Sequence, residues 1–307
     1  MTEQESWTVG RLLNWTTDFL RDKGADSPRL DAEVLLAHAR GCPRIELYTA
    51  FEEEATVPLR EAFRELVRRR SAGTPVAYLV GHREFFSLSF QVTPDVLIPR
   101  PESELLVVRV LDVVKTQAHD GTSQIADVGT GSGILAVCCA KHLPTCRVTA
   151  IDISPAALAV AEANAEQHGV AQRIDFVCAN LFAQPTAPSG IGTNENNLDT
   201  YDVIVSNPPY VATTEMAGLD ADLREHEPHL ALDGGEQGTE VIERLIPQAA
   251  RRLKAGGWLL MEVGPNNAAR VEQLVAGDLH LTPRDTIVDL AGHPRVVQAQ
   301  KKRPTDN

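Results

Sequence analysis

Short apolar segments alternate with helical stretches from Ile98 onward, and this alternation limits the possible folds more than any other feature of the chain. The segments are rich in Val and Ile, as strands buried on both faces are. Strands and helices in alternation form βαβ units, in which a mostly parallel sheet carries helices on both faces. We therefore predict an α/β fold with strands at Gln124 to Val128, Val148 to Asp152, Ile174 to Cys178, Tyr201 to Ser206 and Gly257 to Glu262.

The N-terminal part of the chain has a helical pattern instead. Apolar residues recur at three- and four-residue steps from Val9, which predicts a helix with one apolar face. Ser27 followed by Pro28 predicts the start of a second helix, with the serine as its hydroxyl cap, and this helix is expected to end near Gly41. A third helix is predicted around 58–67. These short helices are expected to pack as a small bundle.

Between His82 and Val92 the pattern changes to period two, in which apolar residues alternate with Ser and Gln. This alternation is typical of a half-buried strand, and we interpret it as a hairpin. The expected organisation is a helical domain over 1–78, a linking β-hairpin over 79–97 and an α/β domain over 98–307. Residues 185–200 are rich in Gly, Pro, Asn and Thr and are expected to form a mobile loop before a strand.

Charge and cysteine content narrow the possible partners. The net charge of −13 repels phosphate backbones, so nucleic acid is disfavoured as the main partner. The five cysteines have no CxxC or Cys/His spacing, so we expect reduced thiols and no metal site. The first ten residues lack an apolar signal core, and no run of about 18 apolar residues occurs. We therefore expect a cytoplasmic protein with no membrane partner.

A glycine-rich turn after the first predicted strand indicates a ligand site. Glycine lets the backbone approach a ligand closely, and the next helix, predicted from Ile134, offers free N–H donors at its start. Asp152 lies nineteen residues after the last glycine, at the end of the next strand, where a carboxylate can accept hydrogen bonds from ribose hydroxyls. Together these features predict a nucleoside cofactor held by Asp127, Gly129, Thr130, Gly131, Ser132, Gly133 and Asp152.

Two kinds of cofactor fit this pattern, a dinucleotide and S-adenosylmethionine. The glycines fall as GxGxG, whereas the dinucleotide pattern is GxGxxG, with a last glycine that lets the helix pack on the strand. The spacing therefore favours S-adenosylmethionine, and the motif at the end of a later strand settles the choice.

That motif is Asn207-Pro208-Pro209-Tyr210, which follows the strand ending at Ser206. Ligands bind at the carboxyl ends of strands in open α/β sheets, so the motif is expected to project into the cofactor pocket. A conjugated nitrogen is a poor nucleophile unless it is oriented. The Asn207 side-chain oxygen and the Pro208 carbonyl can accept its two N–H groups, two prolines restrict the backbone, and Tyr210 can stack on the planar group. We predict an N-methyltransferase that works by positioning rather than with a strong base.

At this point the sequence resembles the HemK family, the protein-(glutamine-N5) methyltransferases that modify peptide chain release factors. The resemblance runs from near Ser27 to Val297 and does not depend on one motif. The stretches that carry it are Leu30 to Glu33, Ile98 to Glu104, Asp127 to Gly133, Val205 to Tyr210, Glu227-Pro228, Leu232 to Gly235 and Asp289 to Gly292.

The resemblance implies a seven-stranded, Rossmann-like class I S-adenosylmethionine-dependent methyltransferase domain, preceded by a helical substrate-recognition domain and a hairpin. It implies that Asn207 to Tyr210 hold the glutamine of a Gly-Gly-Gln loop in a release factor. It also implies that Asn180 and Leu181 flank the adenine and that Asn207 borders the cofactor. Asn180 departs from the family, which usually has Asp there, so an amide replaces an acceptor for the adenine amino group.

Other substrates remain open on the sequence alone. An exocyclic amine of DNA or RNA presents a similar planar nitrogen, although the acidic chain has only one basic cluster, at Arg64 and 68–70, which we interpret as a solvated helix face. A ribosomal-protein glutamine requires the same chemistry as the release-factor glutamine. A non-enzymatic cofactor-binding module is disfavoured by the intact Asn207 to Tyr210 motif.

Overall fold

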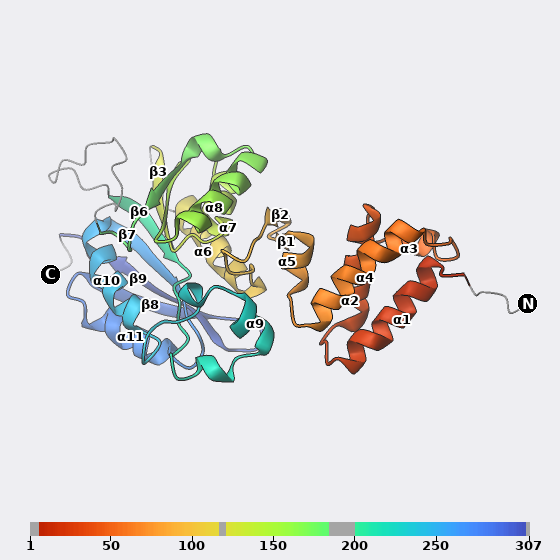
Figure 1. Ribbon diagram of the computed structural model, residues 1–307. Coiled ribbons are helices and arrows are strands. Elements are labelled where there is room, and N and C mark those ends of the chain that lie inside the picture. The colour runs from red at the N-terminus through yellow and green to blue at the C-terminus, as the bar shows by residue number, and fades with distance from the viewer. Residues whose placement is uncertain (1–5, 117–120, 184–199, 305–307) are drawn as a thin grey trace, which may run out of the picture. The chain divides into compact units, whose positions relative to one another are not determined.

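The computed structural model describes residues 6–116, 121–183 and 200–304, and it divides into two compact units (Figure 1). One unit comprises the described residues up to His82 together with the short helix α9 (Ala221–His226). The other comprises Arg83–Asp220 and the described residues from Glu227 onward. No helix in these described ranges is both long enough and apolar enough to cross a membrane. Apart from Thr200, the predicted loop over 185–200 lies outside the described residues.

The N-terminal unit is a helical bundle, and the helices predicted from the apolar periodicity are present in it. Thr8 caps the first helix by accepting a hydrogen bond from the Arg11 N–H. Ser27, expected to cap the second helix, makes no side-chain capping bond, because its backbone does not adopt the extended conformation of Thr8. The helices are α1 (Val9–Asp22), α2 (Pro28–Arg40), α3 (Glu46–Thr49), α4 (Val57–Ser71) and α5 (Val76–Val80).

A buried carboxylate joins α2, α3 and the segment between them. Glu33 of α2 is only 4% exposed. It accepts hydrogen bonds from Arg29 Nε at 2.7 Å, from an Arg44 guanidinium nitrogen at 2.9 Å and from the Tyr48 hydroxyl. Burial alone raises the pKa of Glu33, but the hydrogen bonds from Tyr48, Arg29 and Arg44 outweigh it and lower the pKa below its ordinary value.

Replacing Glu33 with alanine is expected to lower the free energy of unfolding by about 2 kcal/mol, because three donors lose their shared acceptor. The loss is smaller than for a fully buried pair, since the Arg29 and Arg44 side chains are 38% and 51% exposed and can be hydrated again. Urea denaturation followed by circular dichroism measures the change. Glu65→Ala, which removes only an exposed pair with Arg68, serves as the control and is expected to leave the free energy of unfolding nearly unchanged. Equal losses in the two variants would contradict the account.

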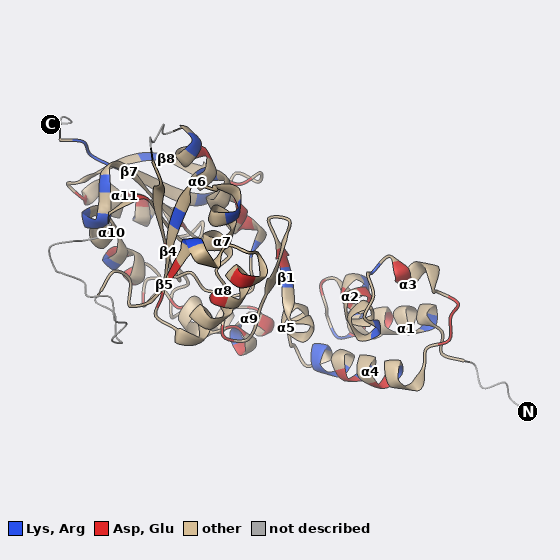
Figure 2. Ribbon diagram, turned by 90° about the horizontal axis from the view of Figure 1, so that it is seen from above, with Lys and Arg blue, Asp and Glu red and all other residues tan. Residues whose placement is uncertain are grey.

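The basic cluster at the end of α4 is only partly a solvated face (Figure 2). Arg68 is exposed and pairs with Glu65 on its own helix. Arg70 differs from the expectation, because its side chain is only 13% exposed and forms ion pairs with Asp31 at 2.8 Å and with Asp222 at 2.6 Å. The clustered arginines therefore include one with a structural role, which is to join α2, α4 and α9 within this unit.

The second unit is built on a seven-stranded sheet in the order β5-β4-β3-β6-β7-β9-β8. The first five strands in this order are parallel, and the sequence predicted all five; the last two pair antiparallel and were not predicted individually. The strand order reverses between β3 and β6, whose carboxyl ends meet where Val128 pairs with Ser206. Ligands bind at such a reversal. The strands are β3 (Ser123–Val128), β4 (Cys146–Asp152), β5 (Ile174–Cys178), β6 (Tyr201–Ser206), β7 (Leu253–Glu262), β8 (Leu281–Val288) and β9 (Pro294–Lys301).

Helices cover both faces of this sheet, as predicted (Figure 1). Successive residues of β6 show the two faces, because Val203 and Val205 belong to one apolar core and Ile204 to the other. On the Val203 face pack α6 (Glu104–Thr116), α7 (Ile134–His142) and α8 (Pro155–Gln167), and on the other pack α10 (Glu240–Arg252) and α11 (Ala268–Gly277). The 3-10 helices are η1 (Pro101–Ser103), η2 (Ala171–Arg173), η3 (Met216–Gly218) and η4 (His229–Ala231).

The predicted hairpin consists of β1 (His82–Phe85) and β2 (Leu88–Gln91). Its turn is formed by Phe86 and Ser87, which have φ of +50° and +60°, so the apolar alternation does not continue as one strand. Glu104 of α6 accepts a hydrogen bond from the Phe86 N–H at 3.0 Å. This acidic residue after the Pro-rich segment therefore anchors the hairpin turn.

Candidate functional site

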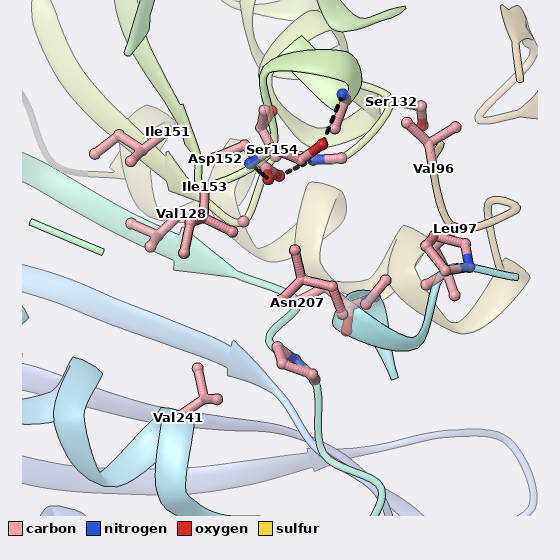
Figure 3. A pocket seen from close by; sticks show the side chains of 18 of the residues that line it. Val96, Leu97, Val128, Ser132, Ile151, Asp152, Ile153, Ser154, Asn207 and Val241 are labelled. Carbon is pink, nitrogen blue, oxygen red and sulfur yellow. Dashed lines mark hydrogen bonds between the residues drawn. The ribbon is translucent and has the colours of Figure 1, made fainter. Parts of the chain in front are cut away.

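A cavity of about 250 Å³ opens at the carboxyl ends of β3, β4 and β6, entirely within the second unit (Figure 3). Asp152 reaches it from the end of β4 and Asn207 from the end of β6. Most residues singled out from the sequence line it, although they come from separate parts of the chain. Those that do are Gly129, Thr130, Gly131, Ser132, Asp152, Asn180, Leu181, Asn207 and Pro209.

The glycine turn is held against the neighbouring strand by its backbone. The N–H groups of Gly129 and Thr130 both donate to the Ile151 carbonyl, at 2.8 and 3.0 Å. The Gly131 N–H donates to Asp152 Oδ2 at 2.9 Å. Gly131 has φ of +55°, and a Cβ added there would meet no atom within 4 Å. The turn thus presents bare backbone to the cavity, where a ligand can approach closely.

Two members of the predicted motif do not line the cavity. Asp127 is fully buried, and its Oδ2 accepts hydrogen bonds from Thr130 Oγ1 at 2.7 Å and from the Ala136 N–H at 3.0 Å. Burial raises the pKa of Asp127 to about 7. Gly133 is the N-cap residue of α7, and a Cβ there would lie 3.0 Å from the Ala161 Cβ. These residues shape the turn and its packing from behind rather than from the cavity wall.

Asp152 has the geometry expected of a ribose-binding acid. Its Oδ2 accepts from the Gly131 N–H and its Oδ1 from the Ser154 N–H at 2.9 Å, which fixes the carboxylate at the cavity wall. Burial raises the pKa of Asp152 above its ordinary value, although backbone N–H groups partly oppose the shift. Each oxygen keeps a further lone pair that can accept from a hydroxyl group.

Asn180 and Leu181 form another part of the wall. Asn180 Oδ1 accepts a hydrogen bond from an Arg244 guanidinium nitrogen at 2.7 Å, which leaves the NH2 group and one further lone pair of Oδ1 for a ligand. Leu181 adopts φ of +55°, which is rare for a residue with a Cβ. The residue that departs from the usual Asp therefore has its oxygen engaged by Arg244.

Asn207 is placed at the end of the central strand, with its amide directed by a neighbour. Its Nδ2 donates to Ser103 Oγ at 3.1 Å, and Ser103 Oγ in turn donates to Glu262 Oε2 at 2.6 Å. Pro208 and Tyr210 do not line the cavity. The Tyr210 ring lies beside Gly264, and its hydroxyl is 3.5 Å from Glu262 Oε1; stacking of this ring on a substrate stays a prediction.

The arrangement fits an adenosyl cofactor. Bare glycine backbone, the Asp152 carboxylate and an apolar wall that includes Ile153 and Val241 surround one cavity at the reversal of strand order. A dinucleotide-type turn would need a further glycine position that the chain lacks.

Comparison with known proteins agrees with this fit. Residues 11–81 match the family model described as the PrmC N-terminal domain, and residues 103–222 match the methyltransferase small domain. The release factor glutamine methyltransferase of Rhodopirellula baltica is 48% identical over 96% of this chain and 97% of its own length. The corresponding protein of Geobacter sulfurreducens is 39% identical over 88% of this chain and 89% of its own. The chain belongs to the release factor glutamine methyltransferase family.

The fold has relatives beyond this family. The catalytic domain of hMettl16, solved in complex with a MAT2A 3'UTR hairpin, has a TM-score of 0.53 and 17% identity, and covers 76% of this chain and 81% of that one. At such identity the likeness shows the fold alone. The predicted family and the class I S-adenosylmethionine-dependent methyltransferase fold are both confirmed, and S-adenosylmethionine is the methyl donor.

The stretch from Leu232 to Gly235, which was singled out only by family resemblance, packs closely against the backbone of the Asn207–Tyr210 segment. A Cβ at Gly234 would lie 2.7 Å from the Pro209 carbonyl oxygen, and one at Gly238 would lie 2.7 Å from that of Tyr210. Asn267 Nδ2 also donates to the Tyr210 carbonyl at 2.9 Å. Gly234 and Gly238 therefore pack directly against the backbone of the Asn207–Tyr210 segment of this methyltransferase. Any residue with a Cβ would clash at this distance, so both positions require glycine.

The Glu227-Pro228 stretch also has a structural explanation. Glu227 is only 4% exposed, and it accepts from the Ile98 N–H at 3.1 Å and from Arg100 at 2.5 Å. Arg100 and Pro228 both line the cavity. The ion pair therefore joins two distant segments of its wall, and no local pattern in the sequence indicated the contact.

Glu262, which the sequence did not single out, is a buried carboxyl next to the site. Burial raises its pKa to about 7, against an unfolded value near 4.5, and so it holds a proton longer in the native state. Its stabilising contribution is complete below about pH 4.5 and is lost as the pH rises through about 7.

Replacing Glu262 with glutamine is therefore expected to flatten the pH dependence of stability. The variant is neutral at every pH, so its unfolding free energy relative to the unmodified protein should rise by roughly 2 kcal/mol between about pH 5 and pH 8. The raised pKa of Asp127 is common to both proteins and cancels in the difference. Urea denaturation at both pH values measures the effect, and parallel pH curves would contradict it.

Proposed function

We propose that this protein transfers the methyl group of S-adenosylmethionine to the side-chain N5 of a protein glutamine, the one in the Gly-Gly-Gln loop of peptide chain release factors. The proposal rests on family membership together with one structural observation: an anchored amide, Asn207, at the carboxyl end of the central strand beside the cofactor cavity. The substrate-recognition role of the N-terminal bundle belongs to the same proposal.

The cofactor is held by the cavity wall. Asp152 would accept from the ribose hydroxyls, Asn180 and Leu181 would flank the adenine, and the turn from Gly129 to Ser132 would lie along the methionine part. All of these residues line the cavity. When bound, S-adenosylmethionine supplies a methyl group on a positively charged sulfur, which needs no metal or strong base for its transfer.

The Asn207–Tyr210 segment orients the nucleophile. Asn207 Oδ1 and the Pro208 carbonyl accept the two N–H groups of the glutamine amide, which turns the nitrogen lone pair toward the methyl carbon. The nitrogen–carbon bond forms as the carbon–sulfur bond breaks, and S-adenosylhomocysteine leaves. The nitrogen then releases one proton to the solvent. Most of the acceleration comes from orientation and from the two carbonyl dipoles facing the developing positive charge.

The alternative substrates are separated by experiment. Purified protein is incubated with radiolabelled S-adenosylmethionine and, in separate reactions, with a release factor, with the same factor carrying a replaced loop glutamine, with ribosomal protein and with DNA. Label on the intact factor alone is expected. Label on DNA, or equal label on the factor lacking its glutamine, would contradict the proposal. The cytoplasmic location expected from the sequence stays a prediction.

A further inference from the structure

A chain of three side chains runs behind the proposed substrate site. Asn207 Nδ2 donates to Ser103 Oγ, and Ser103 Oγ donates to Glu262 Oε2. The three residues come from the end of β6, from η1 and from the end of β7, and Ser103 and Glu262 are 0% and 2% exposed. Water is therefore excluded from the two inner members of the chain.

The direction of the hydrogen bonds follows from the number of protons available. Above about pH 7 Glu262 is ionised, and because a carboxylate accepts and cannot donate, it then takes the single hydroxyl proton of Ser103. The Ser103 oxygen then has only lone pairs for Asn207, which must present its NH2 group and not its oxygen. This arrangement fixes the amide in one of its two orientations, with Oδ1 on the side away from Ser103.

The same carboxylate reaches the other end of the segment. Glu262 Oε1 lies 3.5 Å from the Tyr210 hydroxyl, while Oε2 is bound to Ser103. Both ends of the Asn207–Tyr210 segment are therefore connected to the buried Glu262 carboxylate, Asn207 through Ser103 and Tyr210 directly.

We propose that Ser103 and Glu262 are positioning residues for methyl transfer, because together they lock the Asn207 amide with its Oδ1 toward the substrate nitrogen. This inference rests on the proposed function. Without the lock the amide can rotate by half a turn and present NH2 to the glutamine nitrogen, which repels the substrate N–H instead of accepting it. The lock affects the rate of transfer and does not contribute to cofactor binding.

The first test removes the acceptor of the Asn207 amide. Ser103→Ala is expected to lower kcat for release-factor methylation about tenfold, with the KM for the factor and the Kd for S-adenosylmethionine within about twofold of their original values. Ser103→Thr keeps the hydroxyl and is expected to retain kcat within about threefold. Ser123→Ala makes the same chemical change in another buried serine. Ser123 is the first residue of β3, whereas the cavity opens at the carboxyl end of that strand, so this variant is expected to leave kcat unchanged.

The second test asks whether Ser103 acts through Asn207. In a protein that already carries Asn207→Ala, Ser103 has no side-chain amide to orient. Ser103→Ala is therefore expected to change the residual single-turnover rate by less than about twofold. Thermal unfolding of each variant identifies any that has lost its fold, and Ser103→Thr then still tests the need for the hydroxyl.

The outcomes separate the two proposals. If the unmodified protein does not methylate the release factor, the proposed function is wrong. If it does, the lock is overturned by an unchanged kcat in Ser103→Ala, by an equal loss of rate in the presence and absence of Asn207, or by a loss of cofactor affinity in place of rate.

Discussion

Asn207→Ala is expected to lower kcat about a thousandfold while the Kd for S-adenosylmethionine stays within about threefold. Asn207 Oδ1 is the proposed acceptor that orients the substrate nitrogen. Without it, the lone pair of the glutamine nitrogen stays conjugated with its carbonyl group and is not directed at the methyl carbon. The proposed cofactor contacts come mainly from other strands, with Asp152 at the end of β4 and the glycine turn after β3. Single-turnover methylation measures the rate, and calorimetry measures the affinity for the cofactor.

Asn266→Ala is the matched control, since Asn266 is exposed and lies outside the cavity wall. It is expected to leave both quantities unchanged. If Asn207→Ala lost cofactor binding together with turnover, the division between cofactor residues and the substrate-holding segment would be wrong.

Asp152→Ala is expected to raise the Kd for S-adenosylmethionine about a hundredfold, which corresponds to about 2.7 kcal/mol. Two effects combine in this loss. The ribose hydroxyls lose their acceptor, and the Gly131 N–H loses the carboxylate oxygen that holds the turn at 2.9 Å. Calorimetric titration with S-adenosylhomocysteine gives the affinity without turnover.

Asp175→Ala tests whether the effect belongs to the site. Asp175 is exposed on the neighbouring strand β5 and pairs with Arg147 at 3.3 Å. Its replacement removes the same negative charge and is expected to leave the Kd within about twofold. Similar losses in both variants would mean that net charge, and not a contact with ribose, sets the affinity.

The parallel part of the sheet was predictable because each of its strands carries its own local signal. Ile174–Cys178 and Tyr201–Ser206 have the bounds predicted from their apolar runs, since strands buried on both faces need continuous Val and Ile. The antiparallel strands β8 and β9 were not predicted separately. Most of β8 is exposed or half-buried, and it includes Pro283 and two charged residues, so its sequence resembles a loop.

The cavity wall was predictable where motifs lie in one stretch, as in Gly129 to Ser132 and Asn207 to Tyr210. What could not be predicted depends on contacts between distant positions. Ser103 and Glu262 are separated by 159 residues, and Ile98 and Glu227 by 129. Only the folded chain shows which polar groups are buried together. The sequence also gave no sign that Tyr210 would lie beside Gly264 rather than at the cavity wall.

The position of the transferred methyl group is the most direct test of the central claim. A release factor incubated with this protein and S-adenosylmethionine is digested, and the peptide that contains Gly-Gly-Gln is sequenced by tandem mass spectrometry. The account predicts a single added methyl group on the side chain of that glutamine, and none when Asn207 is replaced by alanine. A methyl group on any other residue, or an unmodified loop peptide after full incubation with folded protein, would contradict it.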